Sequence, residues 1–337
     1  RGQHGVAILF SRSQLARQHL AQGFGTPQYK TFIALTRLGY TPRFVTEDEI
    51  TDGGLSGVKA LVGVAQTFPL PPDVRAAIDK FSSDEGRVIV DGSTTVELPG
   101  AVKMDLALPF TQPGKPHNWG VPNIVAGDND ALMYARWHEE LGVALADALA
   151  DTGRGWLRAE RGPETKVTLM QIDGGCDAKY VVAVNDSHIK TQADWHAVME
   201  KLDVAPAADK PLVYDCNEER LLGATESVTC DLSRTTARVY ALLPRPIKRI
   251  SLAATQRISG GEELVVRVGF DGPEGGRLQA ALPFVLSVTR PDGQLHQEFF
   301  RSTQRNGGFL MSLPIPLNVP PGRWRVDVRS QLTGNVT

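Results

Sequence analysis

Polar side chains follow several short apolar runs in the first hundred residues. They are Ser11, Ser13, Gln66, Asp91, Ser93 and Thr94. If the apolar runs are strands of a doubly wound sheet, these residues stand at the carboxyl ends, where such sheets bind ligands. Their hydroxyl, amide and carboxyl groups could bind a small polar molecule. The same residue types more often cap helices and turns, and both interpretations stay open here.

Patterns typical of a catalytic nucleophile are not found in this region. The turn after ALVGVA reads Gln66-Thr67-Phe68-Pro69 and contains no thiol. Ser93 lacks the flanking glycines of a GxSxG elbow. Gly23-Phe24-Gly25 lacks the lysine and the spacing of a phosphate loop. We therefore expect no catalysis by this part of the chain.

Glycosidases need two carboxylates at a defined separation, and two acidic pairs invite that test. They are Glu139-Glu140 and Glu218-Glu219. Neighbours on a helix point about 100° apart and cannot flank one glycosidic bond, and residues at a hairpin tip are solvated. Both pairs are therefore expected to be surface charges.

The cysteines and the acidic loop Asp173-Gly174-Gly175 do not match metal-site spacings. Cys216 and Cys230 end strand-like segments on either side of a turn-rich stretch, so they could form a disulfide. Two free buried thiols are the equally weighted alternative. Cys176 would be left over. No metal and no cofactor are expected.

The segments that must position the first group of residues alternate between strand and helix. Residues 60–65 form an apolar strand, Pro71 and Pro72 open a helix, and residues 87–91 form a second apolar strand. This is a βαβ unit, which implies parallel strands. Strands over 5–11 and 42–46, with a helix over 27–38 between them, precede it.

Residues 94–129 break this pattern and are rich in proline and glycine. Trp119 in this stretch could stack on a sugar ring, although a tryptophan that pins the loop to its own domain is the favoured interpretation. Residues 130–151 follow with a continuous apolar face and predict a helix.

After Gly153 the apolar period changes from about 3.6 to 2, which indicates strands. Residues 194–202 are expected to form a short helix or turn among them, and Pro291-Asp292-Gly293 predicts a hairpin turn. The predicted fold class is a multidomain α/β plus all-β protein, with a doubly wound, mostly parallel sheet followed by two β-sandwich-like units. The expected domains are residues 1–127, 128–247 and 248–337, the last of them truncated.

The chain has 337 residues, of which 42% are hydrophobic, and a net charge of −2. This balance gives no electrostatic footprint for nucleic acid, and no apolar run approaches the ~18 residues of a membrane span. The sequence starts just before a strand and stops within a β-domain. We expect it to be a segment of a longer protein.

Several stretches resemble known families. VAILFS, Leu38-Gly39, PRFVTEDEI, ALVGVA and RVIVDG resemble the glutamine-amidotransferase-like (flavodoxin-like) domain of family 42 β-galactosidases, where that domain makes the trimer contacts. YVVAVND, PLVYDCNEERLL and VTCDLSRTTARVYALLP resemble the C-terminal β-domain of glycoside hydrolases. RPDGQ and PPGRWRVDV resemble immunoglobulin-like or macroglobulin-type sandwiches.

These resemblances imply a non-catalytic C-terminal portion of a carbohydrate-active or envelope protein that serves scaffolding or oligomerisation. The implied partners are a second copy or a preceding N-terminal domain, with carbohydrate as a candidate ligand. Two alternatives stay open: a degenerate amidotransferase-like module that binds a small ligand, and an adhesion or envelope-assembly protein.

Overall fold

The computed structural model describes residues 5–18, 26–106, 140–150, 152, 157–160, 167–185, 199–204 and 210–337. The chain forms two compact units that are interleaved in sequence. Unit 1 comprises Arg1–Met170, Ala183–Ala205 and Thr229–Thr236, and unit 2 comprises Gln171–Val182, Pro206–Val228 and Ala237–Thr337. The expected domain boundary between residues 247 and 248 lies inside unit 2.

Unit 1 begins with a parallel five-stranded sheet of order β2-β1-β3-β4-β5. Its strands are β1 (Val6–Phe10), β2 (Arg43–Thr46), β3 (Ala60–Gly63), β4 (Arg87–Val90) and β5 (Ala101–Lys103). The chain order reverses between β1 and β3, as in flavodoxin-like sheets. This confirms the predicted doubly wound parallel sheet.

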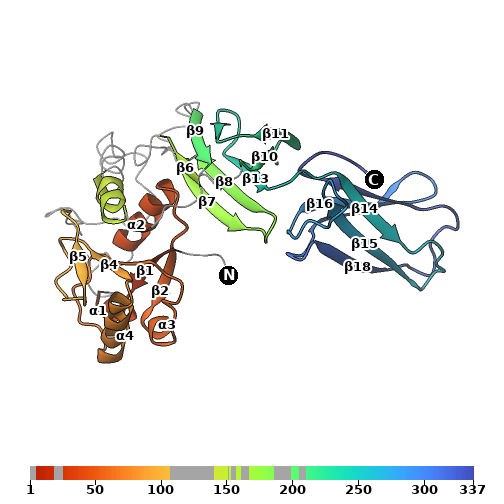
Figure 1. Ribbon diagram of the computed structural model, residues 1–337. Coiled ribbons are helices and arrows are strands. Elements are labelled where there is room, and N and C mark those ends of the chain that lie inside the picture. The colour runs from red at the N-terminus through yellow and green to blue at the C-terminus, as the bar shows by residue number, and fades with distance from the viewer. Residues whose placement is uncertain are drawn as a thin grey trace, which may run out of the picture. The chain divides into compact units, whose positions relative to one another are not determined.

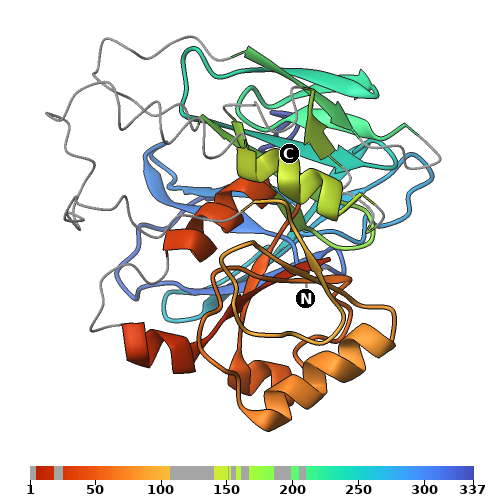
Figure 2. The ribbon, with the colours of Figure 1, turned by 90° about the vertical axis from the view of Figure 1, so that its left-hand side faces the viewer.

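Helices cover both faces of this sheet (Figures 1 and 2). The labelled helices are α1 (Arg12–Gln18), α2 (Thr26–Arg37), α3 (Glu47–Thr51) and α4 (Pro72–Ser83). Helix α2 and the helical residues 140–148 pack on one face, and α3 and α4 pack on the other. These helical residues fall within the range 128–247 expected for the second domain.

Alternate residues of each strand enter opposite cores. Ile8 packs with Leu35 and Leu141 on the α2 face, whereas Leu9 packs with Ile50 and Ile78 on the α4 face. Because a parallel sheet is buried on both faces, its strands are apolar throughout. That is the physical reason for runs such as VAILF, whose first four residues are all buried.

Two antiparallel sheets follow the first domain. One has the order β11-β10-β13-β8-β7 and the other β12-β9-β6. Their strands are β6 (Leu157–Ala159), β7 (Val167–Asp173), β8 (Lys179–Asn185), β9 (Met199–Val204), β10 (Leu212–Asp215), β11 (Arg220–Ala224), β12 (Ser227–Asp231) and β13 (Ala237–Leu243).

One expectation about this region was wrong. The helix or turn expected over residues 194–202 is a strand from Met199 onward, because β9 pairs with β6; residues 194–198 lie outside the described part of the chain. Of the two interpretations left open for Cys216 and Cys230, the structure has the free thiols, with Cys230 buried and Cys216 partly buried. Cys216 follows β10, whose hairpin partner is β11, whereas Cys230 lies on β12 in the three-stranded sheet.

The last part of the chain is a β-sandwich of two three-stranded sheets, β14-β15-β18 and β17-β16-β19. The strands are β14 (Arg249–Ala254), β15 (Glu263–Asp271), β16 (Pro283–Thr289), β17 (Leu295–Ser302), β18 (Gly308–Pro314) and β19 (Arg325–Ser330). Phe270 and Phe284 meet in its core with ring centroids 6.2 Å apart. The predicted turn at Pro291-Asp292-Gly293 joins β16 to β17, and Gly293 has the positive φ (84°) that such turns require.

Within unit 2, the tip of the β7–β8 hairpin docks onto the sandwich. Gly175 forms a β-bridge with Ala280, and the Ala281 amide donates to the Gly174 carbonyl at 2.7 Å. The Tyr180 hydroxyl donates to the Ala281 carbonyl, also at 2.7 Å. These bonds join segments about a hundred residues apart and make the hairpin part of the sandwich's packing.

Candidate functional site

The carboxyl edge of the parallel sheet gathers polar side chains from four successive strand ends. Ser11 follows β1, Glu47 follows β2, Gln66 lies shortly after β3, and Asp91 follows β4. Parallel strands place these residues at one edge of the sheet. The side chains are therefore as close together as the sequence predicted. Their hydrogen bonds show whether they are free to bind a ligand.

Asp91 is the centre of one cluster and is fully buried. Its Oδ1 accepts the Ala65 amide at 2.7 Å and the Thr94 hydroxyl at 2.6 Å. Its Oδ2 accepts both the amide and the hydroxyl of Ser93. Thr94 Oγ1 in turn accepts the Gln66 amide at 3.1 Å. The acceptor positions of the Asp91 carboxylate are therefore filled by donors of the protein itself.

Glu47 is the centre of a second cluster and is 6% exposed. The Ser11 hydroxyl donates to its Oε1 at 2.8 Å, and the Ser13 amide donates to its Oε2 at 3.1 Å. The Gln14 amide donates to Ser11 Oγ at 3.1 Å. Helix α1 has no acidic residue in its first turn, so Glu47 supplies the negative charge that a helix N-terminus favours.

Two glutamines connect the ends of β1 and β3, where the strand order reverses and doubly wound sheets bind their ligands. Gln14 Nε2 donates to the Ala65 carbonyl at 2.6 Å, and Gln14 Oε1 accepts the Thr67 amide at 2.8 Å. Gln66 Nε2 donates to the Phe68 carbonyl at 2.6 Å and to Ser11 Oγ at 3.3 Å. The protein's own side chains thus bridge the crevice.

Ala65 has a left-handed backbone, with φ of 55°, and is completely buried. This conformation costs an L-residue roughly 1–2 kcal/mol. Asp91 holds its amide and Gln14 holds its carbonyl, so the surrounding bonds impose the strain.

The predicted site residues have different outcomes. Ser11, Gln66, Asp91, Ser93 and Thr94 are joined by hydrogen bonds. Ser13 is linked to Ser11 through Glu47, to which its amide donates, and it also lines a pocket on the surface of unit 1. Trp119 lies outside the described residues. For the five residues joined by hydrogen bonds, the geometry supports the interpretation that they cap helices and turns rather than bind a ligand.

Sequence reasoning missed Glu47 and Gln14. Glu47 could have been found, because it directly follows the strand predicted over residues 42–46 and so stands at the same edge. The capping box between Thr46 and Glu49 was a further signal that a helix begins there. Gln14 gave no comparable signal, because helix α1 was not predicted.

Among the described residues, the hydrogen-bond network at this edge contains no histidine and no cysteine. His296 on β17 of the sandwich is the single histidine among them, and its Nδ1 accepts from Arg290 at 3.3 Å. Within the same residues, no three histidine, cysteine or acidic side chains are grouped as metal ligands would be. The edge can accept and donate hydrogen bonds, and its serine hydroxyls donate to the carboxylates of Glu47 and Asp91 rather than to a histidine.

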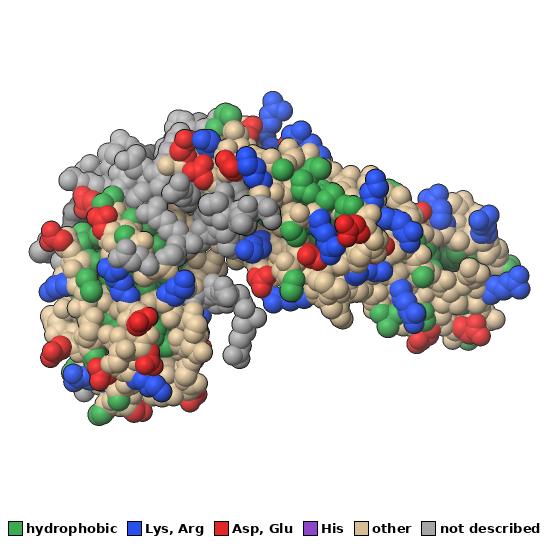
Figure 3. All heavy atoms as spheres, viewed as in Figure 1, with side chains coloured by type: hydrophobic (Ala, Val, Ile, Leu, Met, Phe, Trp, Pro, Cys, Tyr) green, Lys and Arg blue, Asp and Glu red, His purple; other side chains and the backbone are tan. Residues whose placement is uncertain are grey.

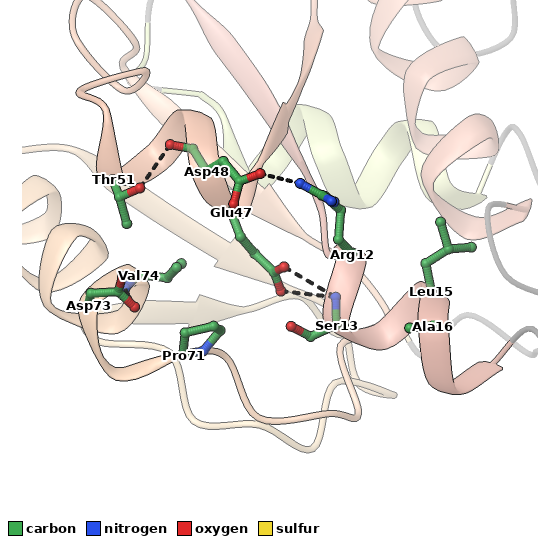
Figure 4. Close-up of a pocket in the computed structure, with 10 residues that line it drawn as sticks. All are labelled: Arg12, Ser13, Leu15, Ala16, Glu47, Asp48, Thr51, Pro71, Asp73 and Val74. Carbon is green, nitrogen blue, oxygen red and sulfur yellow. Dashed lines mark hydrogen bonds and ion pairs between the residues drawn. The ribbon is translucent and has the colours of Figure 1, made fainter.

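An open pocket of about 600 Å³ lies beside the Glu47 cluster (Figure 4). Its walls come from the starts of α1, α3 and α4, each of which follows a strand of the parallel sheet. The lining residues are Arg12, Ser13, Leu15, Ala16, Glu47, Asp48, Thr51, Pro71, Asp73 and Val74. The Arg12 guanidinium is paired with the Asp48 carboxylate.

No protein-family model matches this sequence, and no curated protein matches it. Solved structures that resemble parts of the chain include exo-carrageenase GH42 from Bacteroides ovatus, with 13% identity, a TM-score of 0.41, and coverage of 72% of this chain and 30% of that protein. Escherichia coli alpha-2-macroglobulin has 15% identity, a TM-score of 0.21, and coverage of 39% and 10%. Bacteroides uniformis β-glucuronidase has 14% identity, a TM-score of 0.19, and coverage of 48% and 25%. The chain therefore spans less than a third of the length of each.

Charged side chains of both signs are interspersed over the face shown in Figure 3. This agrees with the net charge of −2. Among the described residues, no helix has the length and apolar character needed to cross a bilayer.

Proposed function

We propose that this chain is a non-catalytic scaffold and self-association portion of a larger carbohydrate-active protein. The observation that carries the proposal is the closed hydrogen-bond network at the carboxyl edge of the sheet. Asp91, Gln66 and Gln14 use their polar atoms to hold the strand ends together. The resemblance of the first domain to the non-catalytic domain of family 42 β-galactosidases supports the carbohydrate-active class.

An exposed aromatic group on the edge strand β2 supports self-association. Phe44 is 40% exposed and stacks on Phe32 of α2, with ring centroids 5.5 Å apart. Tyr29, on the same helix, is 62% exposed. Exposed apolar groups clustered on a sheet edge favour contact with another protein surface. We assign the contact to a second copy through β2 and α2.

Sedimentation velocity of the full chain tests this assignment. We expect an oligomer that the substitution Phe44→Glu dissociates, because a charge would be buried in the contact. Val102→Glu is the matched control, since Val102 is 44% exposed on β5 at the opposite edge of the sheet. A chain that stays monomeric at about 100 μM, well above usual affinities, would remove the self-association role.

The competing proposal is adhesion or envelope assembly through the sandwich. Phe300 on β17 is 64% exposed, so Phe300→Glu provides the discriminating variant. An oligomer that survives Phe44→Glu but dissociates with Phe300→Glu would favour that role. Robust turnover of nitrophenyl glycosides by the isolated chain would refute the non-catalytic assignment itself.

A further inference from the structure

Strand β18 leaves one edge of the sandwich open. It is the outer strand of the sheet β14-β15-β18, and β15 lies on its inner side (Figure 1). Its seven residues, Gly308–Pro314, include no charged side chain and pair with β15 in a register without a bulge. An unprotected edge of this kind is a template for pairing with another strand, and proteins usually block it with charges, bulges or covering segments.

The other three edges of the sandwich have such protection. On β17, the Arg301 guanidinium donates to the Phe300 carbonyl at 2.9 Å. The outer side of β19 is paired with the last residues of the chain, since the amides of Val328 and Thr337 each donate to the other's carbonyl at 3.0 Å. Strand β14 lies next to β19 and begins with Arg249. Within the sandwich, whose residues are all described, β18 is therefore the edge without charge, bulge or cover.

The hydrogen bonds of β15 show which backbone groups of β18 are unpaired. The Thr255 amide donates to the Val265 carbonyl at 3.1 Å, and the Val265 amide donates to Thr255 Oγ1 at 3.0 Å, so Val265 bonds on the β14 side. Alternate residues of a central antiparallel strand bond to opposite neighbours. The next residue, Val266, therefore bonds to β18, where its partner is Met311. The backbone groups of the two residues that flank Met311 point away from β15.

Those two residues are Leu310 and Ser312, which together present two amides and two carbonyls at the open edge. Leu310 is 62% exposed, and Ser312 is exposed as well. No other described segment forms a backbone bond with these four groups. The edge therefore has the free donors and acceptors that strand addition uses.

The edge is complementary to itself in one antiparallel register. With a two-fold axis at Met311, Leu310 of one copy lies opposite Ser312 of the other, and each such pair exchanges two hydrogen bonds. The four open groups of each copy are then all paired. On the core side of the sheet, Phe309 lies opposite Leu313 of the second copy. These two residues and Met311 already pack at the margin of the sandwich core, so the pairing extends that core across the two copies.

Charges on the outer face of the sheet fit the same register. Arg267 is the cross-strand neighbour of Leu310, is exposed, and forms no ion pair with any described residue. The Glu263 carboxylate accepts the Ser312 hydroxyl. Because Ser312 of the second copy lies opposite Leu310, it brings Glu263 of that copy into the row of Arg267. The two-fold axis repeats this pair of opposite charges.

We propose that the sandwich pairs with the sandwich of a second copy through β18, which joins their three-stranded sheets into one continuous antiparallel sheet of six strands. A second copy is the occupant because one register satisfies the backbone groups of the edge, its apolar side chains and the charges of Arg267 and Glu263 together. The contact lies in unit 2, whereas β2 and α2 lie in unit 1. It therefore does not depend on the self-association assigned to β2 and α2.

Cysteine crosslinking of the full chain tests the register, in a Cys176→Ser background that removes the exposed native thiol. Met311 faces Met311 of the second copy in a non-hydrogen-bonded pair, whose Cα atoms lie about 4.5 Å apart, within the range of a disulfide. Met311→Cys should therefore form a covalent dimer under mild oxidation. Leu310→Cys is the matched control. Although Leu310 is more exposed, it meets its own copy only diagonally, at about 7–8 Å, so crosslinking should be about tenfold slower.

Sedimentation velocity of the full chain carrying Phe44→Glu tests the edge without the β2 contact, and we expect a dimer. Adding Leu310→Pro should weaken it at least about tenfold, because proline removes an amide that points away from β15 and so spares the bonds to β15. Arg267→Glu should weaken the dimer about fivefold, as expected for two exposed ion pairs, and Glu263→Arg in the same chain should restore it.

Three results would overturn the proposal. They are equal crosslinking of the two cysteine variants, a dimer that Leu310→Pro leaves intact, and a charge reversal that Glu263→Arg does not rescue. A Phe44→Glu chain that stays monomeric at about 100 μM would also overturn it and would leave the edge to an extended segment of another protein. A circular dichroism spectrum of each variant confirms that it is folded.

Discussion

The carboxyl edge of the parallel sheet and the docked β7–β8 hairpin both depend on hydrogen bonds between distant segments, but they use them differently. At the edge, side chains such as Asp91 bond to turns of the same domain and close the strand ends. At the hairpin, backbone groups pair with the sandwich, and Asp177 accepts the Gln279 amide across 102 residues of sequence. The first network consumes groups that could have formed a site, whereas the second joins two sheets into one body.

The comparison also separates two kinds of strained backbone. Ala65 has a positive φ although it is not glycine, so its neighbours must hold it there. Gly175 has a φ of 120° and lies against the Gln279 carbonyl, so its conformation and its lack of a side chain are both required.

Thiol reactivity should differ strongly between an exposed and a buried cysteine of unit 2. Burial, together with the Asp215 charge, raises the pKa of Cys216 to about 12, whereas Cys176 is exposed at the hairpin tip. The thiolate is the reactive form, so Cys216 should react about 10³-fold more slowly than an ordinary thiol at pH 8. Stopped-flow titration with an aromatic disulfide reagent measures both rates.

Cys176→Ser is the control and should remove the fast phase alone. After unfolding without reductant, all three cysteines should react, because no disulfide joins them in the structure. A single reactive thiol per unfolded chain would contradict this and would indicate a disulfide between Cys216 and Cys230.

Asp91→Ala should cost about 3 kcal/mol of unfolding free energy, because it leaves buried donors of Ala65, Ser93 and Thr94 without their acceptor. Urea unfolding followed by far-UV circular dichroism measures this, since the described helices lie in unit 1. Asp84→Ala, at the exposed end of α4, should change stability little. A loss below about 1 kcal/mol for Asp91→Ala would mean that the network does not close the edge.

Gly175→Ala should cost about 2 kcal/mol in unit 2. A methyl group there would lie 2.7 Å from the Gln279 carbonyl oxygen, in addition to the strain of its positive φ. Gly223→Ala is the matched control, because Gly223 has a φ of 110° and open space around the added carbon. Thermal unfolding of both variants separates the contact from the strain, and equal losses would show that docking contributes nothing.

Ala65→Gly should stabilise unit 1 by about 0.5 kcal/mol. Glycine relieves a left-handed strain of roughly 1–2 kcal/mol. It also raises the conformational entropy of the unfolded chain, which cancels about half of that stabilisation. Ala77→Gly on α4 should instead destabilise by about 1 kcal/mol, as glycine does within helices. Urea unfolding compares the two, and a destabilising Ala65→Gly would show that the methyl group is needed for packing.

Hydrophobic spacing was sufficient to predict the parallel sheet. Strands β1, β3 and β4 are almost entirely buried, so their apolar runs stand out, and Pro71 and Pro72 correctly mark the start of α4. Helix α1 and strand β5 gave weaker signals. Helix α1 spans seven residues without an acidic first turn, and β5 is a three-residue edge strand with no fully buried residue.

The polar residues of the edge could be located from sequence, but their use could not. Ser11, Asp91 and Thr94 were expected at strand ends because chain order alone places them there. Whether they face a ligand or each other depends on distances of a few tenths of an ångström, which spacing does not encode. The docking of Gly175 on Ala280 was likewise invisible, because backbone pairing between distant segments has no residue signature.

The interleaving of the two units has a consequence for how this protein can be dissected and made. Residues Gln171–Val182 belong to the same unit as the sandwich, yet the ribosome releases them long before Ala280. During synthesis the hairpin tip therefore stays undocked until the segment around Ala280 has been made. A gene fragment beginning at β14 would encode the sandwich but omit that hairpin, exposing the backbone of residues 279–281 as an unpaired edge open to aggregation.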